Sequence, residues 1–171
     1  MGQNIWKDGI IGLMVGDALG VPVEFSSRED REHDPVIGMR AYGTHNQPVG
    51  TWSDDSSMTL ATLDSIKQKG KIDYKDIMDK FTEWCLYVDY TPFHELFDIG
   101  VATSRAIIQY RKGTDPIDCG GKTEWDNGNG SLMRILPVCL YLYNRQKMIC
   151  TSENESIYLI HNVSALTHAH F

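Results

Sequence analysis

Apolar residues recur at three- and four-residue spacing along most of this chain, and no pair of segments shows the alternation that β-strands need. This spacing puts apolar side chains on one face of a helix, and it therefore predicts an all-α fold. Prolines and glycines interrupt residues 21–48, which predicts a long loop with at most a short turn of helix. We expect helices at about residues 4–19, 56–69, 73–88, 98–111, 131–143 and 153–167.

Glycines recur in the first predicted helix at Gly9, Gly12, Gly16 and Gly20, so they line one side of it. A glycine in a helix interior costs up to about 1 kcal/mol relative to alanine. Such a stripe is typical of a helix against which another backbone packs closely. We therefore expect this helix to be central and buried.

The size and charge of the chain limit the classes of protein to which it can belong. Its 171 residues fit a single domain, residues 1–171, since about 150 residues make one domain. Its 16 basic and 23 acidic side chains give a net charge of −7, which argues against binding to nucleic acid or anionic lipid. No apolar run reaches the roughly 20 residues of a membrane helix. We expect neither nucleic acid nor membrane as a partner.

The amino-terminal residues lack the basic segment and apolar core of a secretory signal. The cysteines lie far apart in the sequence and form no Cys-x-x-Cys pair; they are Cys85, Cys119, Cys139 and Cys150. Scattered cysteines without a signal are typical of reduced thiols. We therefore expect a cytoplasmic protein with reduced, partly buried cysteines.

The strongest local signal is the sequence Ser53-Asp54-Asp55, directly before a predicted helix. Three hard oxygen donors within one turn suit Mg²⁺, Mn²⁺ or Ca²⁺. The same residues also suit a helix start, because serine and aspartate cap the first turn and acids there complement the helix dipole. Taken alone, this motif leaves both a metal site and an elaborate helix cap open.

Three further acids stand out. Asp17 lies on the otherwise apolar first helix, where an unpaired carboxylate would be costly, so we expect a paired structural acid. Glu24 follows the end of that helix and either points into a cleft or is an exposed loop acid. Asp98 begins another predicted helix, and its default interpretation is an N-cap.

Residues 127–134, Asn-Gly-Asn-Gly-Ser-Leu-Met-Arg, form a glycine-rich loop that leads into a predicted helix. Close backbone approach and unpaired amide donors suit a phosphate or diphosphate, and Arg134 could add a bidentate contact. The alternative is a turn with an ordinary helix cap. Near the carboxyl end, His168 and His170 cannot share a helix face, so they make a poor paired metal site, although one of them could contact a ligand.

Four motifs together resemble the ADP-ribosylglycohydrolase family in their order and spacing: Gly16-Asp17-Ala18-Leu19-Gly20, Ser53-Asp54-Asp55-Ser56, Gly128-Asn129-Gly130-Ser131-Leu132-Met133-Arg134 and Leu166-Thr167-His168. The resemblance extends from residue 11 to residue 170. It implies an all-α orthogonal multi-helix bundle with a binuclear Mg²⁺ or Mn²⁺ centre. The implied activity is hydrolysis that removes ADP-ribose from a modified protein side chain or small-molecule conjugate, and an ADP-ribosylated protein is the implied partner.

The resemblance also implies roles for individual residues. Ser53, Asp54 and Asp55 match the first metal-ligand cluster of the family. Glu24 matches an acid beside the metals and Asp98 an aspartate in the active-site cleft, which makes both of them catalytic acid–base candidates. The substrate-binding positions are Gly128, Asn129, Gly130, Ser131, Leu132, Met133, Arg134 and His168.

The family carries a second metal-ligand cluster, of Asp-x-Asp-Asp-Thr type, well beyond the matched region, and this chain stops at Phe171. We therefore expect a domain that is incomplete at its C-terminal side. Such a chain would bind at most one metal tightly, be at best marginally active alone, and self-associate or need a complementing segment. Two other functions stay open, a module that binds ADP-ribose without turnover and a metal-dependent phosphohydrolase.

Overall fold

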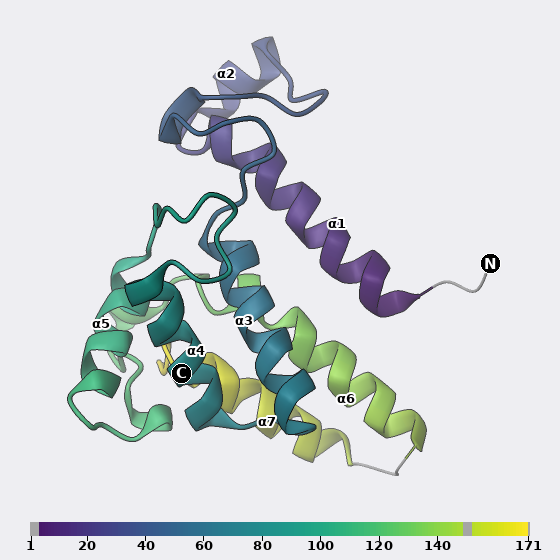
Figure 1. Cartoon of the computed structure of the whole chain (residues 1–171), viewed down its shortest axis with the longest axis vertical. Coiled ribbons are helices and arrows are strands. Elements are labelled where there is room, and N and C mark those ends of the chain that lie inside the picture. Colours follow the sequence, from purple (N-terminus) through teal and green to yellow (C-terminus); the bar gives the residue numbers. More distant parts are fainter. Residues whose placement is uncertain (1–3, 149–151, 171) are drawn as a thin grey trace.

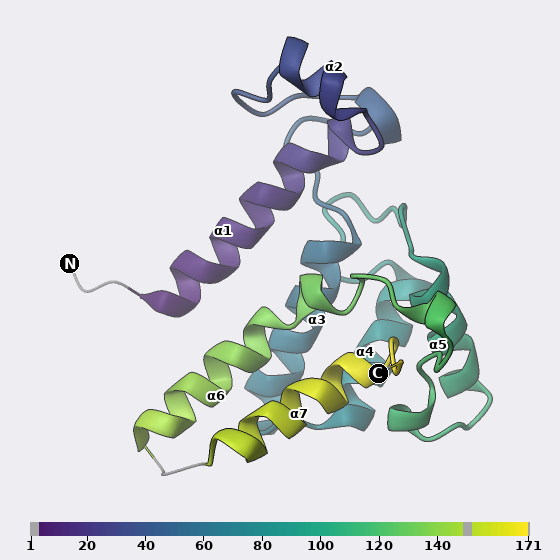
Figure 2. The same ribbon diagram turned by 180° about the vertical axis from the view of Figure 1, so that it is seen from behind.

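The structure, a computed structural model, describes residues 4–148 and 152–170; Figures 1 and 2 show it from opposite sides. Within these residues there are seven α-helices and no β-strand, which confirms the predicted all-α class. They are α1 (Ile5–Gly20), α2 (Arg28–His33), α3 (Asp54–Lys69), α4 (Tyr74–Tyr87), α5 (Val101–Arg111), α6 (Leu136–Met148) and α7 (Glu153–Ala165). Short 3-10 helices η1 to η5 lie at Val21–Val23, Gly43–His45, Pro116–Asp118, Glu124–Asp126 and Leu132–Arg134.

Local sequence explains several helix ends. Asn4 caps α1 by accepting a hydrogen bond from the backbone amide of Lys7, and Asp73 caps α4 in the same way. Gly70 ends α3 with a φ of +67°, a left-handed conformation that glycine adopts without a side-chain clash. The long loop of residues 21–48 contains only the six-residue α2 and two short 3-10 turns.

Two predicted helices differ from those observed. The helix expected from residue 98 begins at Val101, because Asp98 has a φ of +53° and cannot belong to a right-handed helix. The helix expected over residues 131–143 is divided into η5 and α6. Pro137 then falls in the first turn of α6, where its missing amide hydrogen leaves no helical bond unmade.

The core lies between α3, α4, α6 and α7, with α5 packed against α4 (Figure 1). In Figure 2, α6 and α7 lie side by side in front of α3. The largest fully buried apolar side chains are Trp84, Phe81, Met58, Ile77, Met78, Ile107, Leu166, Val138 and Val163. These come from most of the helices of the bundle, so burial of apolar surface holds the elements together.

Helix α1 is not the central, buried helix that its glycines predicted. It contacts α3 and α6 but extends away from the bundle, and of its residues only Ile10 and Ala18 are buried (Figure 1). A methyl group added to Gly12 or Gly16 would meet nothing within 4 Å. The prediction was wrong because this side of the helix faces no other backbone in the structure.

Among the described cysteines, Cys119 is buried and Cys85 and Cys139 are half-buried; all three are free. Cys150 lies outside the described residues. Helices long and apolar enough to cross a membrane do not occur among residues 4–148 and 152–170.

Candidate active site

A cleft of about 390 Å³ collects predicted site residues that lie far apart in the sequence. Part of its lining, which we call the acidic cluster, consists of Glu24, Asp54, Asp55 and Asp98. Another part, which we call the glycine-rich segment, consists of Gly128, Asn129, Gly130 and Met133. His168 lines the cleft beside this segment. The cleft therefore brings together both kinds of residue that the sequence singled out, acids and a glycine-rich loop.

The start of α3 shows how the first acids are positioned. Both backbone and side chain of Ser53 donate hydrogen bonds to the carboxylate of Asp17, at 2.8 to 3.1 Å. Ser56 does the same, at 3.0 Å from its amide and 2.6 Å from its hydroxyl. Asp17 is therefore the paired structural acid that the sequence predicted, and it joins α1 to α3. Because Asp17 and Ser53 already satisfy this helix end, the carboxylates of Asp54 and Asp55 are not needed as caps.

Burial and like charge act together on these two carboxylates. Asp54 is only 7% exposed, and burial, followed by the neighbouring charges of Asp55, Asp98 and Asp17, raises its pKa to about 8. Burial and the charge of Asp17 also raise the pKa of Asp55. A crowd of half-buried carboxylates is stable only when protonated or neutralised by a cation. Hard oxygen donors in this number fit Mg²⁺ or Mn²⁺.

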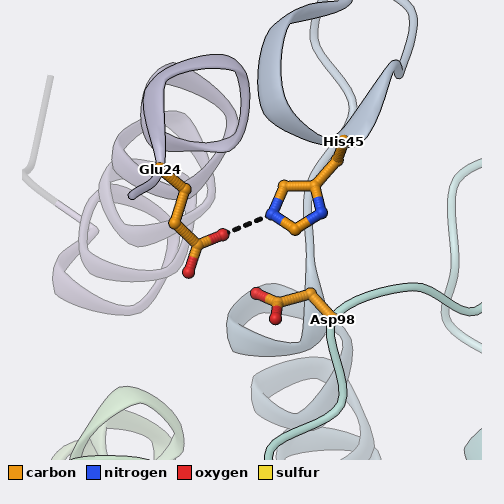
Figure 3. Close-up of side chains that lie close together, drawn as sticks. All are labelled: Glu24, His45 and Asp98. Atoms are coloured by element: carbon orange, nitrogen blue, oxygen red, sulfur yellow. Dashed lines mark hydrogen bonds and ion pairs between the residues drawn. The ribbon is translucent and has the colours of Figure 1, made fainter. Parts of the chain in front are cut away.

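Glu24 is partly buried beside a histidine rather than exposed on a loop (Figure 3). Its Oε2 lies 2.5 Å from Nε2 of His45. Burial raises the pKa of Glu24, the hydrogen bond with His45 opposes this rise, and the charge of Asp98 adds to it. One ligand atom from each of Glu24, His45 and Asp98 lies within 4.8 Å of the others, so these three residues could also hold a metal ion.

Sequence reasoning missed His45, which lies in a polar loop without periodicity. The fold brings it beside Glu24, next to Gly43, which has a φ of +64° and packs so tightly on Pro22 that a Cβ there would overlap the proline backbone. The hydroxyl of Thr44 then donates to the backbone carbonyl of Glu24, at 2.7 Å. Only this unusual glycine, between Tyr42 and Thr44, could have signalled the contact.

Asp98 does not have the N-cap role that was its default interpretation. Its left-handed backbone conformation lies outside α5, and Gly100 takes the N-cap position. Figure 3 shows the Asp98 carboxylate directed toward Glu24 and His45. The aspartate is therefore part of the lining of this cleft.

Gly128 and Gly130 make room for a side chain of the protein itself. A Cβ on Gly130 would lie 3.0 Å from Cε1 and 3.2 Å from Nε2 of His168, and a Cβ on Gly128 would lie 3.5 Å from the same Nε2. The ring of His168 therefore packs directly on the glycine backbone. Neither glycine has a φ in the left-handed region, so close approach rather than backbone conformation requires glycine here.

Arg134 lies elsewhere than expected. Its side chain is fully buried and donates to the carbonyl of Val163 at 3.0 Å and to the hydroxyl of Thr167 at 2.5 Å. The guanidinium lies 5.0 Å from the ring centroid of Phe81, and burial lowers its pKa to about 9. The predicted bidentate contact of Arg134 with a phosphate is therefore wrong in this structure, because the guanidinium faces the core.

Three other predicted residues also lie outside this cleft. The hydroxyl of Ser131 forms a 2.8 Å hydrogen bond with that of Ser164. Leu132 is 71% exposed and lines a neighbouring hollow of about 560 Å³ between α1 and η5. Ser53 lines that same hollow, together with Asp55 and Glu24, which border both spaces.

Comparison with known proteins agrees with the all-helical fold. The chain belongs to the ADP-ribosylglycohydrolase family, whose sequence model matches residues 6–171. This family is metal-dependent. One relative is the ADP-ribosylarginine hydrolase Tri1 of Pseudomonas putida (strain GB-1), 32% identical over 166 residues, which are 95% of this chain and 41% of that protein.

Two further relatives are similar. The Tri1 protein of Serratia proteamaculans (strain 568) is 28% identical over 153 residues, 88% of this chain and 40% of that protein. The ADP-ribosyl-[dinitrogen reductase] glycohydrolase of Rhodospirillum rubrum is 34% identical over 140 residues, 76% of this chain and 42% of that protein. The chain therefore spans less than half the length of these relatives.

Proposed function

We propose that this cleft binds an ADP-ribosyl group and that the protein hydrolyses the bond joining ADP-ribose to a modified side chain or small molecule. The observation that carries the proposal is the single cleft in which the acidic cluster, the glycine-rich segment and His168 meet. The names of the relatives describe proteins that act on ADP-ribosylarginine and on ADP-ribosyl-dinitrogen reductase. An ADP-ribosylarginine side chain is therefore the first substrate to test.

Asp54 and Asp55 are the residues that would hold Mg²⁺ or Mn²⁺ in this cleft. Ser53 lines the neighbouring hollow that Asp55 also borders, and it donates its hydroxyl proton to Asp17 at 2.8 Å, so its oxygen keeps a lone pair for a cation held between the two spaces. A bound divalent cation supplies orientation of the ribose hydroxyls and stabilisation of developing charge. Burial and the neighbouring carboxylates raise the pKa of Asp54 to about 8, and a bound cation would offset both, which supports this assignment.

Glu24 is the proton carrier in this proposal. Cleavage at the anomeric carbon of the ribose passes through an oxocarbenium-like transition state, and the leaving group needs a proton. Burial and the nearby Asp98 raise the pKa of Glu24, which favours the protonated acid that can donate. After the leaving group departs, the Glu24 carboxylate can take a proton from the attacking water. The hydrogen bond with His45 holds the carboxyl group in place during both steps.

A turnover assay tests the proposal. The purified chain is incubated with an ADP-ribosylarginine peptide and Mg²⁺ or Mn²⁺, and the products are identified by mass spectrometry. Because the chain should be at best marginally active alone, we expect slow release of free ADP-ribose. This release should be lost in Glu24→Gln and retained in Asp89→Asn, which removes an exposed acid outside the cleft. Recovery of intact substrate with measurable binding would instead indicate a non-catalytic ADP-ribose-binding module. Release of inorganic phosphate would indicate a phosphohydrolase.

A further inference from the structure

The buried arginine beside the glycine-rich segment is connected to the cleft through one hydroxyl group. Arg134 is 0% exposed, and its terminal nitrogens donate to Val163 O at 3.0 Å, Ser164 O at 3.5 Å and Thr167 Oγ1 at 2.5 Å. A guanidinium group has donors only. The oxygen of Thr167 must therefore accept in this contact.

The same hydroxyl lies 2.8 Å from Nδ1 of His168. Thr167 is 0% exposed, so water does not compete for its proton. Of the two partners that the structure gives Thr167 Oγ1, Arg134 cannot accept a hydrogen bond. The hydroxyl therefore donates to Nδ1 of His168, because the alternative leaves a buried hydroxyl proton unpaired, at a cost of about 1–3 kcal/mol.

This direction of donation fixes the position of the imidazole proton. A neutral imidazole carries one proton, and if Nδ1 accepts, the proton is on Nε2. Burial and the positive charge of Arg134 lower the pKa of His168, while Asp126 opposes them, so the neutral form is favoured. Nε2 is the ring nitrogen that packs against Gly128 and Gly130, and His168 lines the cleft.

We propose that Arg134 acts through Thr167 to hold His168 in the tautomer with its proton on Nε2, and that this N–H donates to an oxygen of the ADP-ribosyl group in the cleft. The identity of the ligand rests on the proposed function, whereas the tautomer does not. Arg134 and Thr167 are positioning residues, since neither touches the ligand. A donor whose direction is fixed before binding needs no reorganisation when the ligand arrives.

The arrangement also explains why an arginine follows the glycine-rich segment yet points into the core. Asn129, Gly130 and Met133 line the cleft, while Arg134, one residue further along η5, is enclosed by α7 and the turn after it. The turn that carries the glycine-rich segment therefore also carries the charge that orients His168. A lysine at this position would lack the planar fork that reaches Val163 O and Thr167 Oγ1 together.

The tautomer can be read directly from the imidazole nitrogens of the ¹⁵N-labelled full chain by long-range ¹H–¹⁵N correlation, with His168→Asn identifying the signals of His168. We expect Nδ1 of His168 to be unprotonated and Nε2 protonated in the unaltered protein. Thr167→Ser keeps the hydroxyl and should keep this tautomer, whereas Thr167→Val should give a mixture of both tautomers. A proton on Nδ1 in the unaltered protein, or the same single tautomer in Thr167→Val, would overturn the inference.

The second half of the proposal is tested with ADP-ribose itself by calorimetry. Only the fraction of the protein with the proton on Nε2 can donate to the ligand, so an equal mixture of tautomers should weaken binding about twofold in Thr167→Val and leave Thr167→Ser close to the unaltered protein. Equal affinity in all three proteins would show that the N–H does not donate to the ligand. If the unaltered protein has the expected tautomer but binds no ADP-ribose, the proposed function fails while the Arg134–Thr167–His168 relay stands. The tautomer of the unaltered protein decides that relay even if Thr167→Val does not fold.

Discussion

The acidic cluster and the glycine-rich segment line one cleft but are stabilised in opposite ways. The acidic cluster places carboxylates of like charge close together, and Asp54 and Glu24 both have raised pKa values. The glycine-rich segment carries no carboxylate among residues 128–130. Behind it, the buried Arg134 donates a hydrogen bond to Thr167, and the hydroxyl of Thr167 is hydrogen-bonded to His168.

This difference shows what each part can contribute to function. The carboxylates of the acidic cluster repel one another when they are ionised. A bound divalent cation offsets this repulsion, so the acidic cluster gains free energy when it binds one. On the glycine-rich side, Nδ1 of His168 already has Thr167 as its hydrogen-bond partner, and residues 128–130 offer no carboxylate to a cation. Its contribution is a ring held in one orientation against a backbone without side chains. Metal-dependent effects should therefore be confined to the acidic cluster.

The largest expected effect comes from removing both adjacent aspartates. Asp54→Ala with Asp55→Ala should weaken Mn²⁺ binding by about 100-fold or more, measured by calorimetry, because both first ligands are lost. Without metal, the double variant should melt no lower than the unaltered protein, because the removed charges repel one another. Asp89→Asn is the matched control and should bind as before. Unchanged metal affinity in the double variant would refute the assignment of these ligands.

Stability against pH gives the next effect. The pKa of Asp54 is raised from 3.8 to about 8, so the folded protein holds a proton that the unfolded chain has released throughout this range. The free energy of unfolding should therefore fall as the pH rises from about 4 to about 8, by at most about 1.4 kcal/mol per pH unit for this group. Urea unfolding in the presence of a chelator measures it.

Asp54→Asn is the control for this pH dependence, and it should flatten the curve. Mn²⁺ added at pH 8 should restore stability to the unaltered protein and not to Asp54→Asn and Asp55→Asn combined. A free energy of unfolding that is flat or rising over this range would show that Asp54 is charged in the folded protein without penalty.

On the other side of the cleft, Gly130→Val should weaken ADP-ribose binding by about tenfold while leaving metal affinity unchanged. A Cβ at this position would lie 3.0 Å from the ring of His168 and displace it, and overpacking of this kind costs about 1–3 kcal/mol. Thermal shift with and without ADP-ribose separates affinity from stability. Gly38→Val is the control, because nothing lies within 4 Å of its Cβ position. Persistent stabilisation by ADP-ribose in Gly130→Val would mean that this loop is only a turn.

The features that were predictable from sequence are those fixed by neighbouring residues. Ser53, Asp54 and Asp55 are adjacent, so the start of α3 carries two carboxylates whatever the rest of the chain does. Helical spacing likewise depends only on the local sequence, and it predicted α3 and α4 to within about two residues.

The features that were missed depend on contacts between distant residues. His45 reaches Glu24 in a loop where Gly43 packs on Pro22 and Thr44 bonds to the Glu24 carbonyl, and both are contacts between distant residues. The direction of Arg134 depends on whether its turn belongs to α6 or, as observed, to a separate 3-10 turn. The glycines of α1 show which side of the helix lacks side chains, but they cannot show whether another element packs against that side.

The smallest effect should come from His45, which forms a hydrogen bond with Glu24 of the acidic cluster. His45→Ala removes the hydrogen bond to Glu24 and the ring contact with Phe97, whose centroid lies 5.2 Å away. One hydrogen bond contributes about 1 kcal/mol, so the free energy of unfolding should fall by roughly that amount. His45→Gln keeps an amide donor for Glu24 and should recover part of the loss, and His33→Ala on the exposed helix α2 should change nothing.

ADP-ribose contacts on the glycine-rich side should be unaffected by His45→Ala, so the His168 resonances should not shift. A shift of those resonances in His45→Ala would show that the two parts of the cleft are coupled and that their separation argued above is wrong.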